Sequence, residues 1–488
     1  MRSHDIIDGM SIIDDIREQN PQSLVVKADK GKKKLIVVES ATKAKEIMHF
    51  LDSNWKALPT KGWIKDIIQP KDVKPDDKPD YGRYGINVTN MDEMLSYVPG
   101  GMKMLSAIRT EINTGNYDTL ICSGDPDRAG SGISAQIAEF LAKDTRRQGM
   151  KTVRACWHEI TRKAVVEGLA NAVEMQDDRN AVEAERARME FDRLFGYSVS
   201  PLLWRAVAAG TSGGRAQSPA LRLVVERERK RMNFVSASYY GIDGVFNEGT
   251  DKEIIASLVS FKGQKIASSA DFNSDGNVKS GVLLLNDNNI QSILNSLNTK
   301  EYKITDIKKT KYTRNPPIPY TTSSFQQNVG TKLGLSSKRA MQIAQQLFEN
   351  AFQTYSRTDS PVMSMEGINA CRKIISNDFN GHMPAKPRIF KSKANAQEGH
   401  ECIRPVVDEN TGLFIDLKTA KKSLSNKSKF DDKAFDIYKL VWQRSVASQM
   451  DAATGTTTTI TIKSTDNEAI FSVASTTIDY KGFMDVYD

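Results

Sequence analysis

Lys34-Leu-Ile-Val-Val-Glu39 is the stretch that decides the fold of the first part of this chain. Its continuous apolar run predicts a buried strand that ends in a carboxylate, and a helix is expected from about residue 42 to 51. Thr119-Leu-Ile-Cys122 predicts a second buried strand, which leads into Ser123-Gly-Asp-Pro-Asp-Arg128 and a helix at about 131–141. Buried apolar strands that alternate with helices are typical of an open, parallel α/β sheet.

Both predicted strands place acidic residues at their carboxyl ends. Because ligands bind at that edge of an open α/β sheet, we expect Glu39, Asp125 and Asp127 to converge there. Two aspartates at i and i+2 with a third carboxylate suit a hard divalent cation such as Mg²⁺. The alternative is that Asp-Pro-Asp forms a turn whose aspartates cap the following helix, and the motif alone leaves both interpretations open.

Thr354-Tyr-Ser-Arg-Thr-Asp-Ser360 is a second candidate site. It follows a predicted amphipathic helix, which Ser336 and Ser337 can cap and whose apolar residues recur every three or four positions from Ala340 onward. A phenol is a poor nucleophile, so attack by Tyr355 on a phosphodiester needs a nearby cation, and Arg357 can bind two phosphate oxygens at once. Taken alone, most such triplets are only a half-buried ring and a solvated charge.

Composition agrees with a partner that carries phosphates. The chain has 488 residues, with 68 Lys and Arg against 60 Asp and Glu, a formal net charge of +8 and a pI near 9.0. Such an excess favours phosphate binding, and the length predicts several domains. The four cysteines are scattered without a Cys-x-x-Cys pair, which favours a reducing, cytoplasmic setting. Neither a membrane span nor a signal peptide is predicted.

Several motifs in one order resemble those of type IA DNA topoisomerases. Four of them resemble the Toprim domain of that family: Val37-Val-Glu-Ser40, Gly62-Trp-Ile-Lys-Asp66, Asp125-Pro-Asp-Arg128 and His158-Glu-Ile-Thr161. Two resemble its helical DNA-binding domain: Phe191-Asp-Arg-Leu-Phe-Gly-Tyr-Ser-Val-Ser-Pro-Leu-Leu-Trp204 and Ser212-Gly-Gly-Arg-Ala-Gln-Ser218. Three resemble its nucleophile domain: Tyr320-Thr-Thr-Ser-Ser-Phe-Gln-Gln327, residues 354–360 and Asn395-Ala-Gln-Glu-Gly-His-Glu-Cys-Ile-Arg-Pro405.

This resemblance implies an isomerase that cuts and reseals one DNA strand without ATP. Tyr355 would attack a phosphodiester and form a 5′-phosphotyrosyl link, another strand would pass, and the freed 3′-hydroxyl would reseal the break. Arg357 and Lys43 would hold the scissile phosphate, and Glu39 would exchange a proton with the 3′ oxygen. His400 would bridge the acids and the DNA, although a histidine merely satisfied by hydrogen bonds is the alternative.

The resemblance also implies ligands. Mg²⁺ would be held by Asp125, Asp127 and Glu39, and the substrate would be single-stranded or negatively supercoiled DNA. The residues expected to contact that DNA are Arg193, Arg215, Gln217, Arg128 and Arg404.

The implied fold is multidomain, α/β and α+β. We expect an extension at 1–32, a Toprim α/β domain at 33–159 and a helical DNA-binding domain at 160–235. A β-rich arch would occupy 236–314 and 452–488, with a helical, winged-helix-like nucleophile domain inserted at 315–451. By resemblance the domains form a toroid.

Three departures from the family pattern bear on function. Ala129 stands where a third Toprim acid is usual, which predicts a weakened Mg²⁺ site, and Trp63 replaces a common histidine. The sequence ends at Asp488, inside what resembles the returning arch, so a separately encoded C-terminal fragment is expected as partner. Two alternatives stay open: an impaired single-stranded-DNA-binding relative, and a Toprim nuclease or primase, which would not need Tyr355.

Overall fold

The computed structural model describes residues 32–142, 150–392, 401–426 and 428–487. These residues fall into two compact units. The first unit contains the described residues up to Arg215, together with Pro317–Met450 and Tyr487, and the second contains Ala216–Pro316 and Asp451–Val486.

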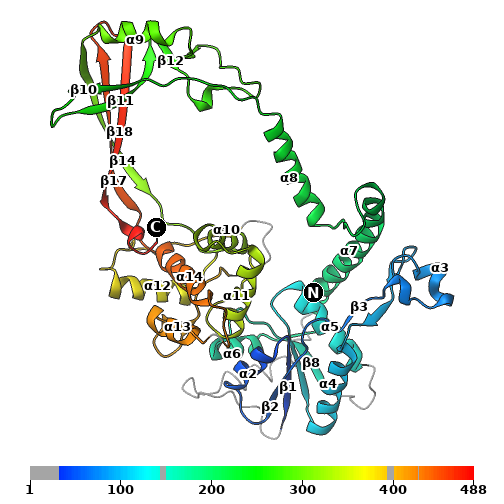
Figure 1. The fold of residues 1–488 in the computed structure, drawn as a ribbon. Helices are drawn as coiled ribbons and strands as arrows, with labels where there is room; N and C mark the ends of the chain where they lie inside the picture. Colours follow the sequence, from blue (N-terminus) through cyan, green and yellow to red (C-terminus); the bar gives the residue numbers. More distant parts are fainter. Residues whose placement is uncertain (1–31, 143–149, 393–400, 427, 488) are drawn as a thin grey trace, which may run out of the picture. The chain divides into compact units, whose positions relative to one another are not determined.

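A five-stranded sheet forms the centre of the first unit (Figure 1). Its order is β2 (Trp55–Pro59), β1 (Lys34–Val38), β7 (Thr119–Ser123), β8 (Lys151–Arg154) and β9 (Val173–Glu174). All neighbouring strands are parallel except β8 and β9. The two strands predicted from their apolar runs are β1 and β7, which lie side by side.

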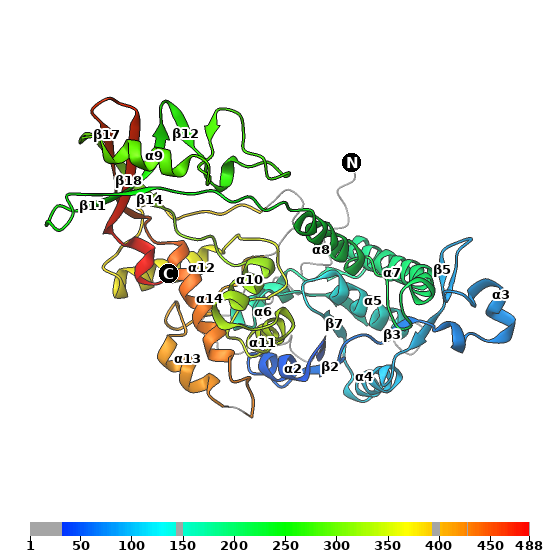
Figure 2. The ribbon, with the colours of Figure 1, turned by 45° about the horizontal axis from the view of Figure 1, so that its top comes forward.

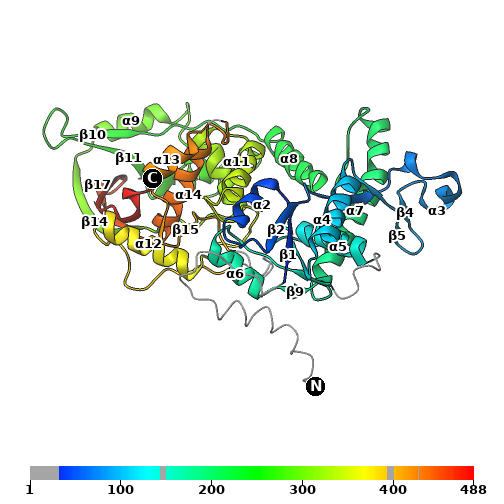
Figure 3. The same cartoon turned by 90° about the horizontal axis from the view of Figure 1, so that it is seen from below.

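Helices cover both faces of this sheet because successive side chains of a strand point to opposite sides. Leu35 and Val37 pack on α4 (Gly101–Gly115) and α5 (Arg128–Ala142). Ile36 and Val38 pack on α2 (Ala41–Met48) and α6 (Arg162–Ala170). Figure 3 shows α2 on one side of β1 and β2, with α4 and α5 on the other. The sheet is therefore buried on both faces, as continuous apolar strands predict.

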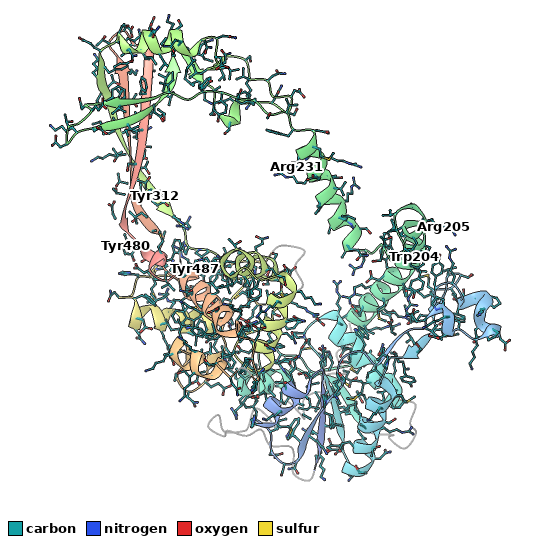
Figure 4. The ribbon with its side chains drawn as sticks, viewed as in Figure 1. Trp204, Arg205, Arg231, Tyr312, Tyr480 and Tyr487 are labelled. Carbon is teal, nitrogen blue, oxygen red and sulfur yellow. The ribbon has the colours of Figure 1, made fainter. Side chains whose placement is uncertain are left out.

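Smaller elements extend this α/β core. Two pairs of short antiparallel strands form here: β3 (Lys65–Ile67) pairs with β6 (Leu95–Tyr97), and β4 (Ile86–Asn87) pairs with β5 (Asp92–Glu93). Along the chain, β3 and β4 are separated by two 3₁₀ turns, Pro70–Asp72 and Pro75–Asp77, and by the short helix α3 (Lys78–Tyr81). The long helix α7 (Arg179–Ala206) packs on α5. Near its end Trp204 is 51% exposed (Figure 4).

Helices dominate the later segment of the first unit. They are α10 (Thr322–Leu333), α11 (Ser337–Glu349), α12 (Met365–Asp378), α13 (Leu417–Leu424) and α14 (Ala434–Ser448), with a small pair of strands, β15 (Val407–Asp408) and β16 (Leu413–Phe414). The predicted cap of α11 is confirmed, since the Ser336 side chain accepts a hydrogen bond from the Arg339 N–H. Phe348 and Tyr355 join the core that contains Ile36 and Val38, which ties this segment to the sheet.

The second unit is built on a mostly antiparallel sheet (Figure 2). Its order is β13 (Val282–Leu283), β12 (Gln264–Ile266), β11 (Ile254–Phe261), β18 (Ala469–Tyr480), β17 (Ala453–Ser464) and β14 (Tyr302–Arg314), and β10 (Asp243–Phe246) pairs with β11. Its helices are α8 (Gln217–Met232) and α9 (Ile290–Asn298), with 3₁₀ turns at Ser269–Asp271 and Gly482–Asp485. Helix α9 was not predicted, because it lies in a segment that was expected to be rich in strands.

Aromatic side chains organise the core of that sheet. Phe246, Tyr302 and Phe471 meet edge to face, with ring centroids 5.2–5.6 Å apart. Leu297 from α9 packs into the same cluster, so the helix covers part of one face. Each unit thus has its own apolar core.

The domain limits expected from the sequence and the toroid stay predictions. None of the helices in the described ranges is long and apolar enough to cross a membrane.

Candidate active site

Three charged side chains meet where β1 and β7 end. The backbone N–H of Asp125 donates to Glu39 Oε1 at 2.9 Å. Lys43, from the first turn of α2, forms an ion pair with the Asp125 carboxylate, and both side chains are less than 10% exposed. The parallel register of β1 and β7 produces this meeting, because it aligns Val38 with Ser123 at the carboxyl edge. The predicted convergence of Glu39 and Asp125 is therefore observed.

Asp127 has two roles in this loop. Its Oδ1 accepts the N–H of Gly130 at 2.9 Å, so it caps the start of α5. Its Oδ2 accepts a hydrogen bond from the Tyr355 hydroxyl at 2.5 Å. The capping interpretation of Asp-Pro-Asp is thus confirmed for Asp127, whereas the metal-binding interpretation stays a prediction. Gly130 permits the tight turn, because a Cβ there would lie only 2.1 Å from the Asp125 carbonyl oxygen.

Tyr355 reaches the acids from an extended segment that follows α11. Gln353, two residues before it, forms a β-bridge with Pro405, and the Tyr355 N–H donates to the His158 carbonyl at 2.8 Å. The ring is buried, with 2% of its surface exposed. Arg357 lies at the rim: its Nη1 is 3.8 Å from Asp127 Oδ2, and its side chain is 67% exposed. A free guanidinium edge is therefore available to an anionic ligand.

Burial and like charges control protonation in this site. Burial, with a further contribution from Asp125, raises the pKa of Glu39 to about 7, although Lys43 opposes the shift. Burial also raises the pKa of the Tyr355 hydroxyl well above its usual value, and Asp125 and Asp127 raise it further against the opposing effect of Arg357. At neutral pH the phenol is thus neutral, and Glu39 is close to half protonated.

Two buried arginines support the site, and one of them, Arg154, has no recognisable signal in the sequence. Arg154 on β8 is 3% exposed, and its guanidinium donates to the carbonyls of Gly124 at 3.0 Å and Asp125 at 2.8 Å. These bonds hold the loop that carries the acids. Arg154 was not predicted, because a lone arginine at a strand end forms no recognisable pattern.

Arg404 is the second buried arginine. It is 1% exposed and forms ion pairs with Glu159 at 3.0 Å and Glu401 at 2.8 Å. Its backbone N–H donates to the hydroxyl of Thr354 at 3.0 Å, and Thr354 directly precedes Tyr355. The observed partners of Arg404 are therefore carboxylates, and its predicted contact with DNA stays a prediction.

The other residues predicted to contact DNA lie in different settings. Arg193 is 8% exposed, and its guanidinium donates to the carbonyls of Ile67 and Ile68 at 2.6 and 2.7 Å. Arg215 pairs with Asp192 at 2.9 Å on an exposed surface. Arg128 is exposed at the start of α5, and Gln217 begins α8 in the second unit. His400 lies outside the described residues.

The carboxylates fit a magnesium ion in kind. Asp125, Asp127 and Glu39 offer the hard oxygen ligands that Mg²⁺ prefers. Within the described residues, however, no three His, Cys, Asp or Glu side chains are grouped closely enough to hold a metal. Lys43 and Tyr355 engage the two aspartates instead. A metal would therefore have to compete with these two contacts.

Two family models match parts of this chain. A family model described as DNA topoisomerase matches residues 176–488, and a Toprim domain model matches residues 34–156. The chain belongs to the type IA DNA topoisomerase family. It is 33% identical over 476 residues to DNA topoisomerase 1 of Streptomyces coelicolor, and 34% identical over 470 residues to that of Mycolicibacterium smegmatis.

These alignments cover 94% and 93% of this chain but 47% and 48% of the two relatives, so the chain spans about half the length of the curated relatives it matches. The fold is similar to that of full-length topoisomerase I from Thermotoga maritima, with a TM-score of 0.71 and 27% identity over 93% of this chain and 67% of that one. This similarity supports the predicted mixed α/β fold class.

Proposed function

We propose that this chain carries the strand-cleavage and resealing centre of a type IA DNA topoisomerase. The observation that carries the proposal is the hydrogen bond of Tyr355 to Asp127. It sets a candidate nucleophile against the Toprim acids, beside the cations of Lys43 and Arg357. A Toprim nuclease or primase has no use for a tyrosine at this position.

The proposed cleavage step transfers two protons. The Tyr355 oxygen attacks phosphorus while its proton passes to Asp127, which already accepts its hydrogen bond. The bond from phosphorus to the 3′ oxygen breaks, and protonated Glu39 gives its proton to that oxygen. Lys43 and Arg357 would offset the charge on the phosphoryl oxygens. Resealing runs the same steps backwards, so the phosphodiester energy is kept and ATP is not needed.

Mg²⁺ would be held by Asp125 and Asp127 at this site. When bound, it supplies positive charge that orients and neutralises DNA phosphates. The chain's own residues keep the site in place: Arg154 fixes the loop that carries both aspartates, and Gly130 allows its turn. Lys43, which pairs with Asp125, would add its positive charge to that of the ion beside the phosphate.

The burial of Tyr355 restricts the substrate. With 2% of the tyrosine exposed, a phosphodiester can reach it only after the covering segments separate locally. A flexible single strand can enter such an opening more easily than a duplex. We therefore propose single-stranded or underwound DNA as substrate, with relaxation of negative supercoils. The need for a separately encoded fragment stays a prediction.

Replacement of the tyrosine tests the proposed nucleophile. Tyr355→Phe should abolish the covalent adduct with a labelled single-stranded oligonucleotide, while binding of that oligonucleotide changes little. Tyr438→Phe is the matched control, because Tyr438 is also buried but donates to the Ile415 carbonyl, away from the acids. Adduct that persists in Tyr355→Phe would contradict the assignment. Binding without adduct in the unmodified chain would indicate the impaired relative.

The sign of supercoiling tests the proposed substrate. Negatively supercoiled plasmid should be relaxed in steps without ATP, because underwinding exposes unpaired strands. Positively supercoiled plasmid should resist under the same conditions. Equal relaxation of the two plasmids, followed by gel electrophoresis, would point to cleavage of duplex DNA instead.

A further inference from the structure

One departure from the family pattern, Trp63, lies close to a buried acid, and the other, Ala129, lies one helical turn away along α5. A Cβ built on Gly132 would sit 2.8 Å from the Trp63 ring and 3.2 Å from Glu185 Cγ. Ala129 and Gly132 are three residues apart on α5, so they share a face of that helix. Glu185, from α7, therefore packs about one helical turn from the position that lacks the usual acid.

Glu185 is buried without full compensation. Its side chain is 1% exposed, and Oε1 lies 2.6 Å from Arg188 Nη2 on the same helix. Oε2 has no hydrogen-bond partner in the part of the chain that the structure describes. A carboxylate oxygen buried in this way costs folding free energy, so a protein rarely keeps one without a use for it. Packing alone gives no reason for an acid at this position.

Space and charge around Glu185 favour a cation. A cavity of about 210 Å³ is lined by Glu185 together with Trp63 and Gly132, which is room for several water molecules. Glu93, Glu139, Glu183 and Glu190 also line it, and Arg186 is its one basic lining residue. Such a wall concentrates cations near the acids. Asp127 and Arg128, at the start of α5, act electrostatically on Glu185.

We propose that Glu185 supplies from α7 the third carboxylate of the Mg²⁺ site through a metal-bound water, in place of the acid absent at Ala129. The inference rests on the proposed metal role of Asp125 and Asp127. Mg²⁺ keeps several of its waters in proteins, so a carboxylate one helical turn away can act through one of them. The weakened site expected from Ala129 is then compensated by a neighbouring helix.

Metal binding by the full chain, without DNA, tests this assignment. Mn²⁺ is the probe, and its dissociation constant is measured by the electron paramagnetic resonance of the free ion. Glu185→Gln should weaken binding about tenfold, the loss expected for one ligand interaction of ~1.4 kcal/mol. Glu183→Gln is the matched control, since Glu183 lies on the same helix and lines the same cavity but is exposed, and it should stay within about twofold of the unmodified chain.

A double-mutant cycle with Ala129→Glu makes the test specific. Ala129→Glu alone should change Mn²⁺ affinity little, because the third carboxylate is already present. In the Glu185→Gln background the same change should restore most of the lost affinity. Glu185→Asp, which keeps the charge on a shorter side chain, should fall between the unmodified chain and Glu185→Gln. It also provides a second variant if Glu185→Gln folds poorly.

The outcomes separate this inference from the proposal on which it rests. If the unmodified chain binds no Mn²⁺, the proposed metal role of the aspartates fails, and this inference fails with it. If Mn²⁺ binds and Asp127→Asn weakens it but Glu185→Gln and Glu185→Asp do not, only this inference is overturned. If these Glu185 variants have lower thermal stability but unchanged Mn²⁺ affinity, this inference is likewise overturned. Glu185 would then serve only as a structural partner of Arg188.

Discussion

Glu39 should make stability depend on pH near neutrality. Its pKa is about 7 in the folded chain and 4.5 without the fold, so the folded state holds the proton more tightly between these values. The free energy of unfolding should therefore lose this contribution as pH rises through that window. Glu39→Gln should remove the effect. Its free energy of unfolding relative to the unmodified chain should rise with pH by at most about 1.4 kcal/mol per unit.

Urea unfolding from pH 4.5 to 8 measures this difference for the two proteins. A constant difference over the whole range would show that Glu39 titrates alike in the folded and unfolded chains. The same titration bears on cleavage, because protonated Glu39 is the proposed donor to the 3′ oxygen. Adduct formation should accordingly slow as pH rises above 7.

Arg404 should contribute far more to the free energy of unfolding than an exposed arginine does. Arg404→Met leaves Glu159 and Glu401 buried without their cation, which should cost about 3–5 kcal/mol. Arg339→Met is the control: Arg339 is 42% exposed and pairs with Asp431, so about 0–1 kcal/mol is expected. Urea denaturation at pH 7 compares the two variants. Equal losses would mean that the buried network contributes no more than a surface pair.

At the scale of elements, the turn from β7 into α5 depends on a glycine. Gly130→Ala places a methyl group 2.1 Å from the Asp125 carbonyl oxygen, so the loop that carries the acids has to move. We expect lower thermal stability and a loss of Mn²⁺ binding and adduct formation together. The cause is steric, because the surrounding atoms are backbone and cannot rotate away.

Gly196→Ala is the matched helix control. A Cβ at Gly196 meets only the Gly213 carbonyl oxygen, at 3.7 Å, which is ordinary contact. Since alanine favours a helix more than glycine does, this variant should be neutral or more stable by up to about 1 kcal/mol. Thermal unfolding and adduct assays on both variants test whether the loop around Gly130 requires a glycine. Full cleavage activity in Gly130→Ala would show that the loop tolerates displacement.

At the scale of the whole molecule, the two units have separate cores and should respond separately to core mutations. Phe471→Ala removes a ring from the second unit's core and should cost that unit about 3–5 kcal/mol. All five tryptophans of the sequence lie in the first unit, so their fluorescence reports on that unit alone. Circular dichroism reports on both units.

The expected result for Phe471→Ala is an earlier transition by circular dichroism, with an unchanged transition by tryptophan fluorescence. Ile121→Ala, in the core of the first unit, is the reciprocal variant and should lower the fluorescence transition. If Phe471→Ala shifts both signals equally, the two units unfold as one cooperative body. The assay needs only the intact chain.

Features that depend on neighbouring residues could be predicted from the amino-acid sequence. The apolar runs of β1 and β7 specify buried strands, Ser336 specifies the start of α11, and the order of motifs specifies the family. Parallel pairing of two strands that end in acids was enough to predict that Glu39 and Asp125 meet. Helix α9 was missed, because its nine residues carry a short apolar pattern inside a segment rich in strands.

Contacts between distant side chains, in contrast, depend on how whole elements pack in the folded chain. Tyr355 and Asp127 are 228 positions apart, and nothing local links the phenol to that carboxylate. The same holds for Arg154, which donates to the loop that carries the acids. It also holds for Glu185, because its proposed role depends on its position on α7 next to Gly132 and near Ala129 on α5. Side-chain patterns fix secondary structure over a few residues. Packing of whole elements brings together groups whose spacing along the chain carries no information.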